Sequence, residues 1–294
     1  MINTAFPVEY QPQLKKAYLN QKKLFPEFGD QKPFLKWAGG KSQMANDIKK
    51  FVPPSFNKYI EPFIGGGAIY FSLNHSKSII SDLNEELIIT YKQVKENVFE
   101  LIQILEGYKN TEDFYYKTRA LDTSRLSNLE RAARLIYLNK TCFNGLFRVN
   151  KKGDFNVPFG KKNGPFLNKE TLLSASIYLQ QTEIYHSDYK DVLQNHAQEG
   201  DFIFLDPPYQ PVGKYSDFKR YTKEFFYEKD QIELACVFKD LVAKGCFVIL
   251  TNSEHPLILE LYKDFQLEII QTKRLISSNP NTRTGVDLMV IGGL

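Results

Sequence analysis

Cysteine and histidine are scarce in this sequence. Its 294 residues include three cysteines, Cys142, Cys236 and Cys246, which are odd in number and have no C-x-x-C spacing. Neither a disulfide framework nor a zinc site is therefore predicted. The four histidines are scattered and form no H-E-x-x-H motif, so we expect no metal site.

A long apolar run is also missing. No stretch approaches the roughly 20 residues that a helix needs to cross a bilayer. The opening residues, MINTAFPVEYQPQLKK, do not combine a charged start with an apolar segment as a secretory signal does. We therefore expect no membrane partner and a cytoplasmic location. Hydrophobic residues make up 43% of the chain and charged residues 24%, which is ordinary for a globular protein with a large core.

Positive charge is concentrated in one segment. The whole chain has a net charge of +4, yet residues 140–162 alone carry six cations and a single acid, Asp154. From residue 142 this segment reads CFNGLFRVNKKGDFNVPFGKK, which is rich in aromatic residues and turn formers. Such a basic segment is typical of surfaces that contact nucleic-acid phosphates. Its cations are Lys140, Arg148, Lys151, Lys152, Lys161 and Lys162.

Strands and helices are predicted to alternate on both sides of this segment. Because such alternation forms parallel sheets, we predict an α/β fold. The expected strands cover residues 58–63, 78–82, 182–188, 201–206 and 246–252, and the expected helices cover residues 68–74, 84–106, 112–122, 128–141 and 228–244. Two last strands, 266–276 and 286–292, are separated by a polar loop and predict an antiparallel hairpin at the sheet edge.

The interruption of this alternation predicts an inserted subdomain. We expect residues 32–106 and 182–294 to form the main ligand-binding domain, with residues 107–181 inserted into it. Residues 1–31 are polar without a clear period, and we interpret them as an N-terminal extension.

A glycine turn and an acid follow the first two strands. Gly65 to Gly67 in EPFIGGGAIYF allow the backbone to pass close to a ligand at a helix start. Asp82 ends the next strand, where a carboxylate can accept bonds from ribose hydroxyls. The spacing does not match G-x-G-x-x-G, which disfavours a dinucleotide. The alternatives are a tight turn for the glycines and, for Asp82 with Glu85, a capping box.

The stretch DPPY, residues 206–209, directly follows an apolar strand. The Asp206 carboxylate and the carbonyl of Pro207, which has a fixed φ, place two acceptors side by side, and such a pair suits an exocyclic NH₂ group. Tyr209 adds a flat face for stacking. These residues predict a site for a flat amino-heterocycle such as adenine; the alternative is a rigid turn with a helix cap.

These motifs, in this order, resemble the Dam family of DNA adenine-N6 methyltransferases with the α-type motif order. The resemblance covers about residues 33–292. It rests on FLKWAGGK (34–41), EPFIGGGAIYF (61–71), SDLN (81–84), CFNGLFRVN (142–150), FNVPFG (155–160), DPPY (206–209) and the tail RLISSNPNTRTGVDLMVIG. It implies a Rossmann-like, S-adenosylmethionine-dependent methyltransferase sheet with an antiparallel edge hairpin and an inserted helical and hairpin DNA-recognition subdomain.

The resemblance also implies S-adenosylmethionine as the cofactor and a flipped adenine as the methyl acceptor. Asp206 and the Pro207 carbonyl would bind the N6 amine, and Tyr209 would stack on the base. The catalytic residues implied are Asp206, Pro207, Pro208 and Tyr209. The cofactor-binding residues implied are Trp37, Lys41 (on the cofactor's carboxylate), Phe63, Gly65, Asp82 (on the ribose), Asp188 (a looser match, near the adenine) and Asp206.

The segment CFNGLFRVN predicts a β-hairpin with its turn at Asn144–Gly145, and the resemblance implies that this hairpin enters the major groove. Arg148 would contact a guanine, Phe143 would wedge into the base stack, and Asn144 would contact the orphaned base. The DNA-contacting residues implied are Lys36, Phe143, Asn144, Leu146, Arg148 and Pro158. The target implied is GATC. The remaining lysines of the basic segment are interpreted as phosphate contacts.

Two other functions remain open at this point. One is methylation of another planar NH₂ group: cytosine N4, an RNA base or a protein glutamine, although glutamine enzymes usually carry asparagine in place of Asp206. The other is non-catalytic DNA binding, against which the intact DPPY and FLKWAGGK count. The expected partner is double-stranded DNA. Two settings stay open: protection against a cognate restriction endonuclease, which would be a genetic partner without stable binding, and repair or regulation without such an enzyme. We expect a monomer, because an asymmetric hairpin reader needs no dimer.

Overall fold

The computed structural model describes residues 31–37, 39–73, 75–150, 153–161, 164–211, 226–273 and 284–293. Some expectations fall outside these ranges. They are the N-terminal extension up to residue 30, the phosphate contacts of Lys151, Lys152 and Lys162, and the end of the strand expected at 266–276.

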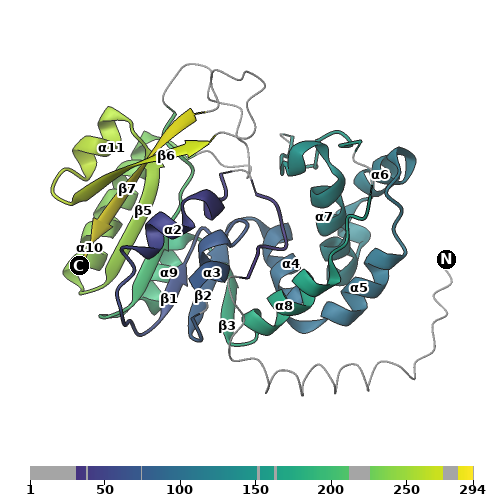
Figure 1. Ribbon diagram of the computed structural model, residues 1–294, viewed down its shortest axis with the longest axis horizontal. Helices are drawn as coiled ribbons and strands as arrows, with labels where there is room; N and C mark the ends of the chain where they lie inside the picture. The colour runs from purple at the N-terminus through teal and green to yellow at the C-terminus, as the bar shows by residue number, and fades with distance from the viewer. Residues whose placement is uncertain are drawn as a thin grey trace.

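A mixed seven-stranded sheet, in the order β3-β2-β1-β4-β5-β7-β6, forms the centre of the described chain. The strands are β1 (Tyr59–Glu61), β2 (Ser78–Asp82), β3 (Thr182–His186), β4 (Phe202–Leu205), β5 (Phe247–Ser253), β6 (Gln266–Lys273) and β7 (Thr284–Gly292). Strands β1 to β5 are parallel, whereas β7 is antiparallel to both β5 and β6. The predicted α/β fold with an antiparallel edge hairpin is confirmed (Figure 1).

Strand β4 explains why a short, continuous apolar run becomes a central strand. Successive side chains of a strand point to opposite faces of the sheet. Phe202 and Phe204 therefore join the hydrophobic cluster on one face, while Ile203 and Leu205 join the cluster on the other. All four side chains are buried, as expected for a parallel sheet covered on both faces.

Helices flank the sheet, and one group of them stands beside the β3 edge. The helices are α2 (Ala45–Lys49), α3 (Ala68–Leu73), α4 (Glu85–Glu96), α5 (Val98–Glu106), α6 (Glu112–Arg119), α7 (Asn128–Thr141), α8 (Lys169–Leu179), α9 (Tyr189–His196), α10 (Glu228–Ala243) and α11 (Pro256–Leu261), with 3₁₀ turns at Lys41–Gln43, Thr123–Arg125 and Phe143–Gly145. Figure 1 shows α4 to α8 as the group at the side. No helix within the described ranges is long and apolar enough to cross a membrane.

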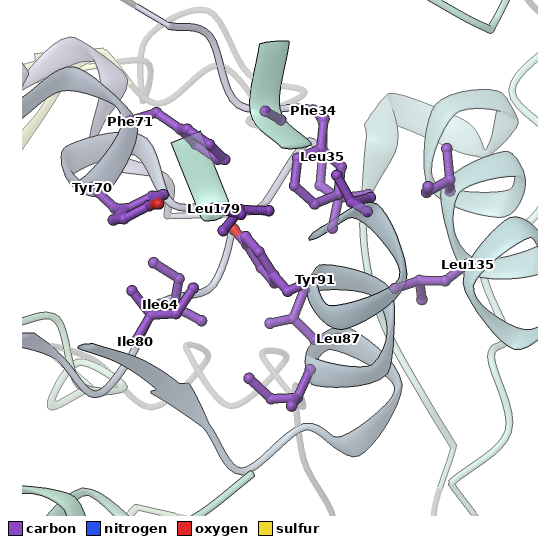
Figure 2. Packing of buried hydrophobic residues seen from close by; sticks show 14 of the residues in the cluster. Phe34, Leu35, Ile64, Tyr70, Phe71, Ile80, Leu87, Tyr91, Leu135 and Leu179 are labelled. Carbon is purple, nitrogen blue, oxygen red and sulfur yellow. The ribbon is translucent and has the colours of Figure 1, made fainter. Parts of the chain in front are cut away.

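Residues 31–37 run between the sheet and this group of helices (Figure 1). Phe34 is buried with its ring centroid 5.0 Å from that of Tyr91 on α4. Figure 2 shows Phe34, Leu35 and Tyr91 close together, with Leu135 of α7 on the neighbouring helix. One hydrophobic cluster thus includes sheet residues and α7. The division of the chain at residues 107 and 181 stays a prediction.

The long helix expected at 84–106 is wrong, because the chain forms two helices, α4 and α5, instead. They are separated by Asn97, whose φ of −131° and ψ of 37° are not helical. The Asn97 side chain donates a 2.9 Å hydrogen bond to the side chain of Gln93. Asparagine favours such positions because its amide bonds locally and competes with the helical backbone.

The hairpin turn expected at Asn144–Gly145 is also wrong in position. Both residues do adopt left-handed φ angles, 56° and 67°, but they form a 3₁₀ turn within one arm of the hairpin. The chain reverses between Asn150 and Asp154, where the Asn150 N–H donates to the Asp154 carbonyl at 2.9 Å. Isolated bridges pair the two arms, Val149 with Phe155 and Cys142 with Phe159.

Candidate active site and DNA interface

Three acidic residues gather at the carboxyl ends of the central strands. Glu61 ends β1, Asp82 ends β2, and Asp206 directly follows β4. Strand β1 lies between β2 and β4, so the strand order reverses direction here. Such a switch point is where open α/β sheets bind their ligands.

The Asp206 carboxylate is held from two sides. Lys41 Nζ lies 2.7 Å from Oδ1 and 2.8 Å from Oδ2. Thr251 Oγ1 donates a 2.7 Å hydrogen bond to Oδ1. The Lys41 ammonium also donates to the Gly39 carbonyl at 2.6 Å, so protein acceptors surround it. The position of the carboxylate at the end of β4 is therefore fixed before any ligand arrives.

Lys41 keeps its proton in this environment. The residue is only 5% exposed, and burial alone lowers the pKa of its amine. The adjacent Asp206 carboxylate acts in the opposite direction and is strong enough that the net pKa is raised. The site thus contains a permanent cation directly against Asp206.

The two prolines differ in what their carbonyls contact. The Pro208 carbonyl accepts a 2.9 Å hydrogen bond from Gln231 Nε2 on α10. Within the described part of the chain, no hydrogen bond reaches the Pro207 carbonyl. The Pro207 carbonyl therefore keeps its acceptor capacity next to Asp206, whereas Pro208 anchors the turn to the helix.

Tyr209 places its ring beside the same carboxylate. Lys41 Nζ lies 4.7 Å from the ring centroid, and the phenol donates a long, 3.5 Å hydrogen bond to Asp287 on β7. Burial raises the pKa of Tyr209, so its hydroxyl stays protonated and neutral. Asp206 and Tyr209 are both next to Lys41, as the DPPY motif requires if it forms one site.

Asp82 contacts the glycine turn and does not cap α4, so the capping box with Glu85 is wrong. Its Oδ2 accepts from the Gly65 N–H at 3.1 Å, and its Oδ1 accepts from the Asn84 N–H at 2.9 Å. Asn84 is the cap, with its side chain accepting from the Leu87 N–H. Each Asp82 oxygen has a further lone pair, which suits two ribose hydroxyls.

The glycine turn is shaped by Trp37. A Cβ atom at Gly65 would lie 2.8 Å from Trp37 Cδ1, and one at Gly66 would lie 2.9 Å from Trp37 Cβ. Gly65 also has a φ of +45°, which side chains rarely adopt. On its other side the indole stacks on Phe147, with ring centroids 4.9 Å apart and planes 19° apart. Glycine is needed here for packing as well as for any ligand.

Phe63 and Asp188 lie beyond the ends of β1 and β3. The Phe63 ring centroid is 5.1 Å from that of Tyr189, the residue after Asp188. Asp188 is the N-cap of α9 and accepts from the Lys190 N–H at 2.9 Å. The structure gives Asp188 a structural role, and its contact with a cofactor stays a prediction. Trp37 packs on Gly65, and the Gly65 N–H bonds to Asp82; their joint use with Phe63 in binding a nucleoside stays a prediction.

Cofactor affinity is expected to fall as the pH drops below about 6. Burial raises the pKa of Asp82 from 3.8 to about 6, although backbone N–H groups oppose the shift. If Asp82 accepts the ribose hydroxyls as predicted, its protonation below that pH removes acceptor capacity, and affinity should fall about tenfold per pH unit. Titration of the unreactive product S-adenosylhomocysteine, followed by tryptophan fluorescence, measures it. In Asp82→Asn, affinity should be low and independent of pH; the same pH slope in this variant would contradict the assignment.

The predicted DNA-contacting residues lie along the hairpin and the segment beside it. Phe143 is 51% exposed, as a side chain that inserts into DNA must be. Arg148 is exposed, and its Nε donates a 2.8 Å hydrogen bond to Asn156 Oδ1 on the opposite arm. The Pro158 carbonyl accepts from the Phe143 N–H at 2.9 Å. The hairpin therefore fixes the direction of Arg148 and the base of the Phe143 turn.

Lys36 joins this surface from the N-terminal segment. A Cβ atom at Gly145 would lie 2.4 Å from Lys36 Cδ, so the lysine stem packs directly on the Asn144–Gly145 turn. Lys140, one of the predicted phosphate contacts, is partly buried. Burial and, to a smaller extent, Lys36 lower the pKa of Lys140 to about 8, so Lys140 is still mostly charged at neutral pH.

Several residues at the site were missed by sequence reasoning. Thr251 belongs to the apolar run CFVILTN, which ends on polar residues as the DPPY strand does, and the same strand-end rule could have found it. Glu61, 2% exposed, accepts from Tyr59 Oη at 2.6 Å and from the Tyr70 N–H at 3.0 Å. Asn156 lies within the motif FNVPFG, but nothing in that motif singled it out as the partner of Arg148.

The sheet order and the acidic strand ends define a Rossmann-like α/β protein with its ligand site at the switch point. Comparison with known proteins gives the family. Residues 37–276 match the description of the D12 class N6 adenine-specific DNA methyltransferases, and the chain belongs to this family.

Curated relatives are similar over most of the chain. The type II methyltransferase M1.LlaDCHI of Lactococcus lactis subsp. cremoris is 40% identical, covering 88% of this chain and 94% of its own. The type II methyltransferase M.MjaIII of Methanocaldococcus jannaschii is 39% identical, covering 86% and 95%. The DNA adenine methylase of Escherichia coli is 33% identical, covering 86% and 92%.

The protein is thus an adenine-specific DNA methyltransferase with S-adenosylmethionine as methyl donor and DNA as substrate, which confirms these predictions. No target sequence is contained in the names of these relatives. The GATC target and the roles of individual residues stay predictions.

Proposed function

We propose that the N6 amine of the target adenine is held between the Asp206 carboxylate and the Pro207 carbonyl. The observation that carries this proposal is the fixed carboxylate at the end of β4, with Lys41 Nζ and Thr251 Oγ1 each 2.7 Å from its Oδ1. The neighbouring Pro207 carbonyl supplies a second acceptor, and the Tyr209 ring supplies the face on which the flipped base stacks.

The chemistry then follows from positioning. S-adenosylmethionine, when bound, supplies an electrophilic methyl group. The two acceptors take the two N6–H groups and direct the nitrogen lone pair away from themselves. The nitrogen gains a methyl group and loses one proton, and Asp206 is within hydrogen-bond reach of that proton. Orientation and fixed charge supply the rate enhancement, with no covalent nucleophile.

The cofactor is proposed to lie at the carboxyl ends of β1 and β2, next to the point where the strand order reverses. Asp82 accepts the ribose hydroxyls, Phe63 and Trp37 contact the flat or apolar parts, and Gly65 allows close approach of the backbone. Asp188 is assigned to the adenine end. We assign Lys41 first to Asp206, because its ammonium already contacts both carboxylate oxygens; binding of the cofactor carboxylate is a second role.

The hairpin is proposed to open the duplex and read it. Phe143 wedges into the stack that the adenine leaves, and Asn144 contacts the base left unpaired. Arg148, oriented by Asn156, contacts a guanine edge. With Lys36, Leu146 and Pro158, these residues support GATC as the target.

Methylation of GATC is the expected result of the first test. Labelled S-adenosylmethionine is supplied with a duplex containing one GATC, with a scrambled duplex and with RNA of the same sequence, and the products are digested to nucleosides for mass analysis. N6-methyladenine should come from the GATC duplex alone. Labelling of the scrambled duplex at an equal rate would contradict the target, and N4-methylcytosine would contradict the chosen amine.

Arg148→Ala is expected to weaken the preference for guanine at one position of the target sequence. A bidentate arginine–guanine contact contributes about 1–3 kcal/mol of discrimination, so the preference for GATC over the duplex altered at that guanine should fall about 5- to 150-fold. Comparing kcat/KM on the two duplexes measures it. Arg125→Ala is the matched control, since this exposed arginine pairs with Asp122 before the first residue of α7, whereas the hairpin follows the last residue of that helix. An undiminished preference in Arg148→Ala would contradict the assignment.

The remaining proposals concern the setting. Two relatives are named type II methyltransferases, which supports protection against a cognate restriction endonuclease that is not stably bound. Recognition of DNA by one hairpin of the chain supports a monomer. Sedimentation of the protein with and without a duplex tests this state. A DNA substrate supports the predicted cytoplasmic location.

A further inference from the structure

Asn139 on α7 is a fully buried polar side chain (0% exposed) that contacts two functional segments at once. Its Oδ1 accepts from the Lys36 N–H at 2.8 Å, and its Nδ2 donates to the Lys36 carbonyl at 2.7 Å. The same Nδ2 lies 3.5 Å from the Gly145 carbonyl. One amide thus satisfies both backbone groups of Lys36 and touches the Asn144–Gly145 turn.

These contacts link the proposed cofactor site at Trp37, Gly65 and Asp82 to the hairpin that is proposed to recognise DNA. Trp37, the next residue after Lys36, fills the space above Gly65 and Gly66, and the Gly65 N–H bonds to Asp82. On the other side the Trp37 ring stacks on Phe147, between Leu146 and Arg148 in the hairpin. Asn139 holds the backbone of Lys36, which lies at the centre of these contacts. Because Trp37 follows Lys36 and stacks on Phe147, a shift of the hairpin must move Trp37.

Resting on the proposed roles of Trp37 and the hairpin, we propose that Asn139 is a positioning residue that couples DNA recognition to cofactor binding. The Asn139 carbonyl oxygen and NH₂ group are both hydrogen-bonded inside the protein. The side chain therefore tolerates few alternative positions, because each buried hydrogen bond that is lost costs stability. Lys36, Trp37 and the Asn144–Gly145 turn therefore move as one unit. Binding of the correct duplex orders this unit and favours the conformation that binds the cofactor, and the reverse holds equally.

The chain contains its own reporter for this coupling. Trp37 is its single tryptophan and lies between the two sites, so its fluorescence reports binding of S-adenosylhomocysteine. The measured quantity is the ratio of the dissociation constants without and with saturating target duplex. Typical couplings are about 5- to 150-fold, and we expect about tenfold for the unchanged protein.

Asn139→Ala is expected to bring this ratio close to one. Thr141→Val is the matched control, because Thr141 is also buried on the same helix and its hydroxyl donates to the Tyr137 carbonyl of that helix. Among the described residues, this hydroxyl bonds to no group of Lys36 or the hairpin, so the ratio should stay unchanged. Phe147→Leu provides a second route, since it weakens the stack on Trp37 and leaves Asn139 in place. Its ratio should fall as well, even if Asn139→Ala folds poorly.

Three results would overturn the inference. One is a wild-type ratio of one, which would leave the methyltransferase activity intact but remove the coupling. Another is an unchanged ratio in Phe147→Leu and in folded Asn139→Ala. The third is an equal loss of coupling in Thr141→Val, which would indicate general loosening of α7. A wild-type protein that binds S-adenosylhomocysteine but methylates no duplex would instead contradict the proposed function.

Discussion

Replacing Asp206 with alanine is expected to lower methyl transfer by about a thousandfold while the affinity for the duplex stays within a factor of about three. The carboxylate is the acceptor that fixes the N6 amine, and without it the amine is bound by the Pro207 carbonyl alone. DNA affinity comes chiefly from the hairpin and the phosphate contacts, which the substitution does not touch. Single-turnover transfer and fluorescence anisotropy with labelled duplex measure the two quantities.

A second aspartate of the same strand region provides the control. Asp201 directly precedes β4 and is fully buried, with Lys58 Nζ 3.4 Å from its Oδ2, at the opposite end of the strand from Asp206. Asp201→Asn should lower stability but leave single-turnover transfer per folded molecule unchanged. Undiminished transfer by Asp206→Ala, or an equal loss in Asp201→Asn, would contradict the mechanism.

Lys41→Met is expected to destabilise the fold by about 2 kcal/mol and to lower methyl transfer by about a hundredfold. The substitution removes the cation from a carboxylate whose side chain is only 20% exposed, and an unpaired buried charge is costly. The value is set below the range for fully buried pairs because water reaches Asp206. Transfer falls because the carboxylate loses the group that orients it. Denaturant unfolding and single-turnover kinetics measure the two effects.

Combining Lys41→Met with Asp206→Asn separates the two effects. The double variant removes both charges, so stability should recover at least half of the loss seen in Lys41→Met. Transfer should stay as low as in the single variants, because neither the ionised acceptor nor its orienting cation is present. A double variant that regains transfer along with stability would contradict both the catalytic role of the Asp206 carboxylate and the orienting role of Lys41.

Much of the fold could be predicted because strand signals are local. The run FIFL of β4 is apolar and is followed by DPPY, and this pattern predicted a central strand with a site at its end. The parallel sheet followed from the alternation of strands and helices, and the edge hairpin followed from two last strands separated by a polar loop. The errors arose where local rules compete: Asn97 ends a helix that the apolar period continues, and Asn84 takes the cap that the D-x-x-E pattern gave to Asp82.

The hairpin error has a similar cause. Asn144–Gly145 adopts the left-handed angles that such a pair favours. The location of the chain reversal, however, depends on which arms pair, and the bonds between Asn150 and Asp154 set it two residues beyond Arg148. A turn propensity predicts a turn, but only the pairing of distant residues decides whether that turn joins two strands.

The sequence by itself determined the alternating α/β architecture, the acidic strand ends and the DPPY acceptor pair, because each depends on residues within a few positions of one another. Tertiary structure alone decided the partners of those groups. Lys41 meets Asp206 across 165 positions, and Asn139 meets Lys36 across 103. Such contacts form only when packing of the sheet and helices brings distant segments together, and no local pattern specifies which distant groups will meet.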